Sequence, residues 1–164
     1  MKTLILIIAS FTSLLALFGG GYLYTQRHKR KKQSIPLSSD YALTGMILLR
    51  TTINNKRCVF LLDTGAEISS LEESKAKELG LTLQKSESNI CGIGGETNTT
   101  LITQAEVKYQ HKTFPVDFYI INMVEVFRKI KASTGVTVHG ILGMDFIYES
   151  GLILDFNKKT LYFK

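Results

Sequence analysis

The sequence predicts an all-β domain with one or two short helices, preceded by one N-terminal transmembrane helix. Two observations support this prediction. From residue 41 onward, short runs of aliphatic and β-branched residues alternate with turn-forming residues, which is the pattern of strands joined by hairpins. Ahead of them lies an uncharged apolar run, long enough to span a bilayer as a helix. With 164 residues the chain is expected to hold one domain of ordinary size.

Residues 1–26 are expected to form a membrane anchor. The run from Thr3 to Gln26 carries no charge, and Leu4 to Tyr24 contains 21 residues. At a rise of ~1.5 Å per residue, a helix of that length covers the hydrocarbon core of ~30 Å. A basic cluster follows at 27–32, and by the positive-inside rule this side faces the cytoplasm. We therefore expect a single-pass protein that contacts the lipid bilayer through residues 4–24 and the basic segment 27–32.

The alternative for the N-terminal run is a cleaved signal peptide followed by export. A signal peptide has a shorter apolar core, and the dense basic cluster downstream would resist export. Residues 27–40 are interpreted as a basic juxtamembrane segment and a short polar linker. The folded domain is then expected at 41–164.

The charge distribution argues against nucleic-acid binding. The net charge is +6, but six basic residues and no acidic residue precede position 33, so the remainder carries 14 of each sign. A neutral domain lacks the excess of Lys and Arg that collects phosphates. Cys58 and Cys91 lack the spacing of a metal site and are expected to be reduced thiols.

The expected strands share aliphatic, Thr or aromatic runs bounded by Asn, Gly or Lys turns. They are 42–53, 57–62, 81–90, 97–109, 113–121, 137–142, 152–156 and 160–163. Helix-forming residues occur in three segments, at 70–79, 123–130 and 143–148. No internal repeat is present, so any twofold symmetry requires a second chain.

The segment that carries chemistry is Asp63-Thr64-Gly65-Ala66, directly after the apolar run 59–62. A carboxylate delivered at the end of a buried strand is costly unless it is hydrogen-bonded or used. Gly65 allows the backbone to turn so that N–H groups point back at the carboxylate. Taken alone, a simple turn after a strand is an equally good interpretation.

Two further motifs follow in order, the glycine-rich Gly92-Ile93-Gly94-Gly95 and the apolar Ile141-Leu142-Gly143. Together with the first motif, they resemble the retropepsin-like aspartic proteases over residues 41–164. The resemblance implies a closed β-barrel, peptide-bond hydrolysis and no metal or organic cofactor.

The resemblance also implies roles for individual residues. Asp63 would be the catalytic aspartate, supported by Thr64, Gly65, Ala66, Ile141, Leu142 and Gly143. Residues Gly92, Ile93, Gly94 and Gly95 would form a flap over a polypeptide substrate. Two positions depart from the pattern of the retroviral members. Glu67 stands where they usually carry Asp, and Met144-Asp145 stands where they carry the Arg that pairs with this Asp. The segment 122–138 is longer than a minimal member needs and is expected to edge the cleft.

The expected function is that of a membrane-anchored aspartic endopeptidase active as a homodimer. The mechanism needs two carboxylates that share a proton, and the chain has one Asp-Thr-Gly. The other aspartates, at 40, 117, 145 and 155, are expected to be turn or surface acids. A non-catalytic dimerisation or peptide-binding module of the same fold is the alternative. The sequence contains no histidine pair with the spacing of zinc ligands and no Gly-x-Ser-x-Gly motif of an esterase.

Overall fold

The computed structural model describes residues 34–37, 41, 44–92 and 95–164. For residues 87–92 and 95–100 it describes the backbone only. Residues 34–164 form one compact unit. The expected anchor at 4–24 and the basic segment at 27–32 lie outside the described residues. Among the helices of the described residues, none combines the length and the apolar character needed to cross a membrane.

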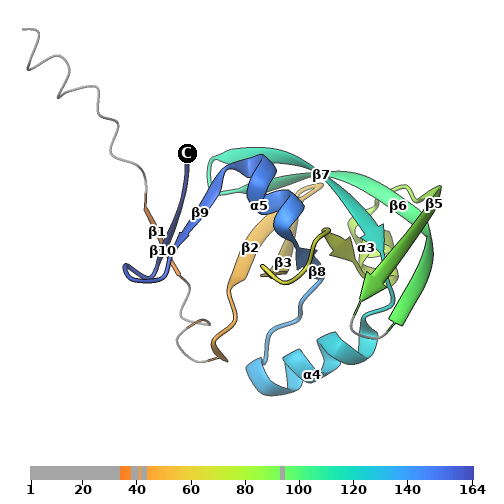
Figure 1. The fold of residues 1–164 in the computed structure, drawn as a ribbon, viewed down its shortest axis with the longest axis horizontal. Coiled ribbons are helices and arrows are strands. Elements are labelled where there is room, and N and C mark those ends of the chain that lie inside the picture. Colours follow the sequence, from red (N-terminus) through yellow and green to blue (C-terminus); the bar gives the residue numbers. More distant parts are fainter. Residues whose placement is uncertain (1–33, 38–40, 42–43, 93–94) are drawn as a thin grey trace, which may run out of the picture. The chain divides into compact units, whose positions relative to one another are not determined.

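A closed β-barrel organises the domain (Figure 1). Its strands follow the order β2, β3, β8, β4, β7, β6, and a pairing between β2 and β6 at Thr52 and Lys108 closes the ring. β5 lies outside the ring on β6. The bounds are β2 Leu48–Ile53, β3 Lys56–Leu62, β4 Ser70–Leu71, β5 Gln84–Gly92, β6 Gly95–Tyr109, β7 Lys112–Ile120 and β8 Gly140–Leu142. The closed barrel expected from the resemblance is therefore confirmed.

A second sheet of three strands has the order β1, β10, β9. β9 (Leu152–Asp155) and β10 (Thr160–Phe163) form the last hairpin, as predicted, and β1 (Ile35–Pro36) pairs with β10. Ile35 and Pro36 were expected in the linker. Pro36 lacks a backbone N–H, and a strand at the edge of a sheet tolerates this.

Three helices have both ends among the described residues, where one or two were predicted. They are α3 (Glu73–Leu79), α4 (Val124–Thr134) and α5 (Met144–Ser150). α4 continues past the expected end at residue 130 and stops at Gly135, whose φ of 73° suits a left-handed C-cap. All three segments had helix-forming residues, and tertiary packing of Phe127 and Phe146 stabilises α4 and α5.

Several boundaries differ from the prediction because of backbone pairing. The helix expected from residue 70 begins at Glu73, since Ser70 and Leu71 pair with both β7 and β8 as strand β4. β2 begins at Leu48 instead of residue 42, after a turn in which the Gly45 N–H donates to the Tyr41 carbonyl at 2.9 Å.

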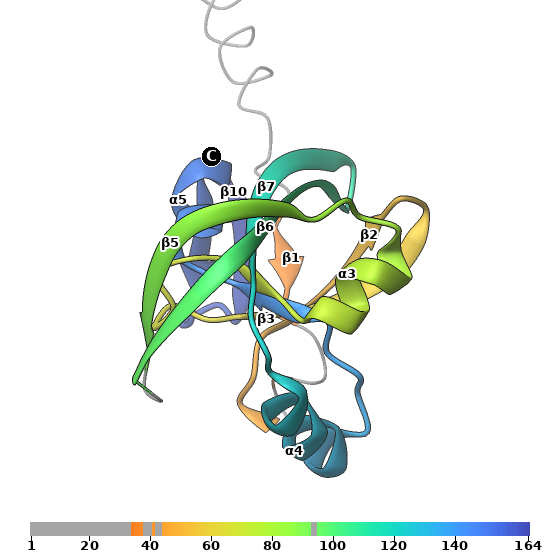
Figure 2. The same cartoon turned by 90° about the vertical axis from the view of Figure 1, so that its right-hand side faces the viewer.

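The core consists of two clusters on either side of the β2–β3–β8 layer. The larger fills the barrel, where Phe60 and Phe118 stack with ring centroids 5.3 Å apart. Helix α4 lies below β3 in the view of Figure 2. The smaller cluster lies under this helix, where Met123 and Phe127 pack with Leu48 and Val138. The thiol of Cys58 is buried, and burial raises its pKa, so the protonated and unreactive form is favoured.

Candidate active site

Two segments that are distant in the sequence meet at the candidate site. β3 and β8 run parallel, with Leu61 opposite Ile141 and Leu62 opposite Leu142. The ladder continues one residue further, because the Asp63 N–H donates to the Leu142 carbonyl at 3.0 Å. This pairing places the loop that begins at Asp63 beside the loop that begins at Gly143.

Asp63 is half-buried, and its carboxylate is oriented by its own loop. The Gly65 N–H donates to Oδ1 at 2.8 Å, and the Ala66 N–H donates to the Asp63 carbonyl at 3.2 Å. A Cβ on Gly65 would lie 3.2 Å from Asp63 Oδ1, which is a close contact with the carboxylate. The sequence expectation that backbone amides point back at the carboxylate is confirmed for Gly65.

Gly143 is required because two backbones approach each other closely. A Cβ at this position would lie 2.8 Å from the carbonyl oxygens of Ala66 and Ile68. The Met144 N–H donates to the Ala66 carbonyl at 2.8 Å, and the Asp145 N–H donates to the Glu67 carbonyl at 3.2 Å. Ala66 and Gly143 therefore hold the two loops together, with Leu142 fully buried behind them.

Ser69 and Asp145 brace this arrangement. The two carboxylate oxygens of Asp145 accept from the Ser69 N–H and hydroxyl, both at 2.7 Å. The Gly143 N–H then donates to Ser69 Oγ at 3.1 Å. Asp145, expected to be a turn or surface acid, is instead a half-buried brace between the two loops. An acid in the first turn of the helix expected at 143–148 is also typical of the protein surface, so this local signal did not distinguish the two roles.

The departures at Glu67 and Met144 are explained by this brace. Both side chains are exposed, and within the described part of the chain Glu67 makes no ion pair. Backbone bonds to the Glu67 and Ala66 carbonyls and the Asp145 carboxylate bind the loops without an Arg at position 144.

Replacing Asp145 by Asn is expected to lower the free energy of unfolding by about 2 kcal/mol. The amide retains one acceptor but turns an NH₂ group toward a donor, and hydrogen bonds to charged groups contribute ~1.5–3 kcal/mol. Urea denaturation measures the loss. Asp117→Asn is the matched control, because Asp117 is exposed and accepts from the Gln104 side chain at 2.8 Å. Equal stability of the two variants would show that the brace contributes little.

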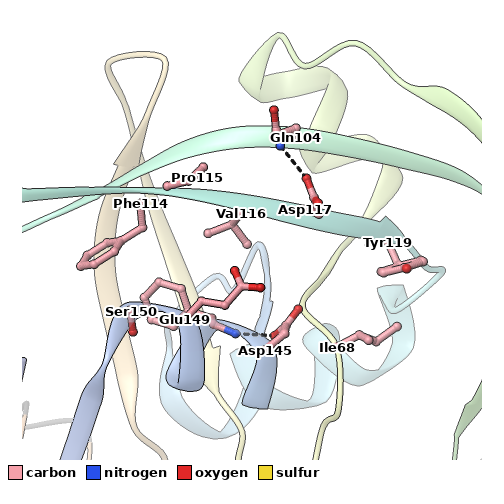
Figure 3. A pocket seen from close by; sticks show the side chains of 11 residues that line it. Ile68, Gln104, Phe114, Pro115, Val116, Asp117, Tyr119, Asp145, Glu149 and Ser150 are labelled. Atoms are coloured by element: carbon pink, nitrogen blue, oxygen red, sulfur yellow. Dashed lines mark hydrogen bonds between the residues drawn. The ribbon is translucent and has the colours of Figure 1, made fainter.

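Two cavities lie near these loops. One, of about 350 Å³, includes Asp63 and is lined by Tyr41, Gly45, Met46, Ile47, Leu61, Leu62, Asp63, Thr64 and Phe156. The other, of about 380 Å³, lies between β7 and α5 and includes Asp145 but not Asp63 (Figure 3). The first cavity is the candidate site, because its lining combines Asp63 with a largely apolar wall.

The remaining predicted residues are placed as follows. Thr64 is exposed beside Asp63, and Ile141 is half-buried on β8. Gly92 and Gly95 form the last pair of the β5–β6 hairpin, and Ile93 and Gly94 lie outside the described residues. The role of this hairpin as a flap stays a prediction. So does a cleft-edge role for 122–138, where α4 packs against a cluster that includes Leu61 and Ile141.

Comparison with known proteins places the site in a family. The family model for aspartyl proteases matches residues 49–146. A retropepsin-like aspartic protease from Rickettsia conorii has 18% identity and a TM-score of 0.53, covering 80% of this chain and 89% of its own. The EIAV protease complexed with the inhibitor HBY-793 has 22% identity and a TM-score of 0.49, covering 66% of this chain and 91% of its own. No curated protein matches the chain.

The matched region contains both loops of the site and the strands that carry them. It begins inside β2, includes Asp63 and Gly143, and ends at Phe146 in α5. The structure from Rickettsia conorii adds a likeness of fold at low sequence identity. The chain therefore belongs to the aspartyl protease family and has a retropepsin-like fold.

Proposed function

We propose that this protein is an aspartic endopeptidase that acts as a homodimer, with one Asp63 from each chain in the active site. The observation that supports it is the Asp63 carboxylate, which the Gly65 N–H orients at the edge of an open cavity. In a member of the aspartyl protease family, this arrangement is the one that acid–base hydrolysis needs.

The need for two chains follows from the carboxylates. Among the described residues that line the Asp63 cavity, no other is an acid. Asp145 is engaged by Ser69, and Asp155 pairs with Lys158 at 2.8 Å. A twofold axis through the site would bring the partner's Asp63 beside the first, and an isologous dimer achieves this directly.

In the proposed reaction, the two Asp63 carboxylates share one proton, because like charges so close cannot both ionise. The ionised carboxylate acts as general base on a water molecule between them. The protonated one donates a hydrogen bond to the scissile carbonyl. The Gly65 N–H keeps one oxygen oriented while the proton moves. The substrate would be an extended polypeptide that pairs with the β5–β6 hairpin of each chain as an added strand.

The enzyme is further proposed to be held on the cytoplasmic side of a membrane by residues 4–24, with 27–32 at the surface. This rests on the length of the uncharged run and on the basic cluster after it. Anchoring confines the chains to two dimensions and raises their effective concentration, so it favours the dimer without any new contact.

The proposed function is tested by incubating the full chain with a proteome-derived peptide library and identifying new termini by mass spectrometry. Cleavage that requires Asp63 supports an endopeptidase. A chain that binds peptides and cleaves none would instead be a binding module.

The dependence of kcat/KM on pH is expected to be bell-shaped. At high pH both carboxylates lose the shared proton, and at low pH both are protonated, so the pair titrates on each limb. Initial rates on one library-derived peptide measure the profile. A rate that rises to a plateau on the alkaline side would point to a histidine base and contradict the shared proton.

A further inference from the structure

His139 lies where the two strands of the site first meet. It directly precedes β8 and is 8% exposed. Its backbone N–H donates to the Val59 carbonyl at 2.8 Å, and its own carbonyl accepts from the Glu72 N–H at 3.2 Å. Its side chain completes the contact, because Nδ1 accepts from the Val59 N–H at 3.2 Å. His139 therefore forms hydrogen bonds with both the N–H and the carbonyl of Val59.

This geometry requires a neutral imidazole. Nδ1 can accept a hydrogen bond only when it carries no proton, so the ring must be the tautomer with hydrogen on Nε2. Protonation would place two donors against each other and leave the Val59 N–H without its acceptor. The Val59 carbonyl would attract an imidazolium, but the Val59 N–H already directs its hydrogen at Nδ1.

The charged groups around the ring come from α3. Burial lowers the pKa of His139, and the ammonium of Lys75 lowers it further. The carboxylate of Glu78 and the backbone at Val59 and Thr137 act in the opposite direction without cancelling the shift. Lys75 and Glu78 also pair with each other at 2.5 Å, which weakens the effect of Glu78 on the ring.

The contact between Val59 and His139 is the first rung of the ladder that ends at the catalytic loops. The next rungs join Phe60 to Gly140 and Leu62 to Leu142, and the last is the bond from the Asp63 N–H to Leu142. We propose that neutral His139 is a positioning residue, which keeps β3 in register with β8 and thereby aligns the loops of Asp63 and Gly143. Where it concerns cleavage, this inference rests on the proposed function.

The consequence is an acid limit on the folded enzyme. Because the folded-state pKa is lowered, the stabilising contribution of His139 is complete above the ordinary histidine pKa of about 6.5. It is lost as the pH falls from there through the folded-state pKa. A carboxylate dyad alone would tolerate such acidity, so His139 suits the enzyme to a compartment near neutral pH.

The test uses the full chain in detergent micelles and compares His139→Asn with His111→Asn. Asn places Oδ1 near the position of Nδ1, so it can accept from Val59 but does not titrate. His111 is exposed in the turn between β6 and β7 and is the matched control. Thermal unfolding is followed by circular dichroism from pH 7.5 to 5.0.

We expect the Tm of the wild type and of His111→Asn to fall by about 3 to 5 °C more than that of His139→Asn over this range. Relative to cleavage at pH 7.5, cleavage at pH 5.0 should be higher in His139→Asn than in the wild type, because the variant does not titrate at this position. Parallel Tm curves for all three proteins would overturn the inference.

A second measurement applies even if His139→Asn does not fold. In the wild type labelled at histidine, ¹⁵N chemical shifts identify which ring nitrogen carries hydrogen. An unprotonated Nδ1 at pH 7.5 and a titration midpoint of His139 below the ordinary histidine pKa of about 6.5 support the inference, and a protonated Nδ1 or a midpoint at or above that value overturns it. Because neither Tm nor ¹⁵N shifts require cleavage, a pH effect without any hydrolysis would reject the proposed function alone.

Discussion

Replacing Asp63 by Asn is expected to abolish peptide cleavage while the fold and the dimer persist. The amide has the shape of the carboxylate, and its oxygen can still accept from the Gly65 N–H. It cannot share a proton with a second carboxylate, so both the general base and the general acid are lost. We expect the rate to fall by at least about a thousandfold, since general acid–base catalysis contributes ~10²–10⁴-fold.

The measurement is the initial rate on a peptide from the library, with the Tm and the sedimentation of the variant as checks on folding. Asp117→Asn is the matched control, because Asp117 is exposed on β7 and does not line the Asp63 cavity. Cleavage by Asp63→Asn at a rate close to wild type would mean that another residue carries the chemistry, and the proposed function would be rejected.

An excess of Asp63→Asn chains is expected to inactivate wild-type chains. If each site needs one Asp63 from each chain, a mixed dimer contains a single catalytic carboxylate and is inactive. With nine mutant chains for each wild-type chain, random pairing leaves about one wild-type chain in ten with a wild-type partner. Activity per wild-type chain should therefore fall about tenfold.

For this experiment the two proteins are mixed in detergent and reconstituted together in vesicles. Dilution of the wild type into more lipid should also lower its activity faster than in proportion, because anchored chains meet in two dimensions. Co-reconstituted Asp117→Asn serves as the control and should not inhibit. Activity that scales linearly with protein that is monomeric by ultracentrifugation, without inhibition by the mutant, would mean that the second carboxylate lies within the chain.

The strands and the first loop could be predicted because their signals are local. Asn54 and Asn55 adopt φ values of 48° and 61°, which Asn tolerates better than most residues, and they join β2 to β3 where the sequence predicted a turn. The apolar residues of 59–62 followed by Asp63-Thr64-Gly65 placed a carboxylate at the end of a buried strand. Neighbouring residues determine both features.

The brace and the first rung of the ladder could not be predicted, because their partners lie far apart in the chain. Ser69 and Asp145 are 76 positions apart, and Val59 and His139 are 80 positions apart. An acid in the first turn of a short helix looks like a surface residue when only its neighbours are considered. It becomes half-buried only when α5 packs beside the Asp63 loop.

The sequence by itself determined the strand and turn pattern, the motif at Asp63 and the family resemblance that unites three separate motifs. The tertiary structure alone decided that Ser70 and Leu71 form a strand that joins β8 to β7 within the ring. It also decided that Asp145 and His139 hold the loops of the site. The physical reason is that turn and strand propensities depend on adjacent residues. The identity of a strand's neighbour depends instead on which apolar faces and unpaired backbone groups the whole chain can bury together.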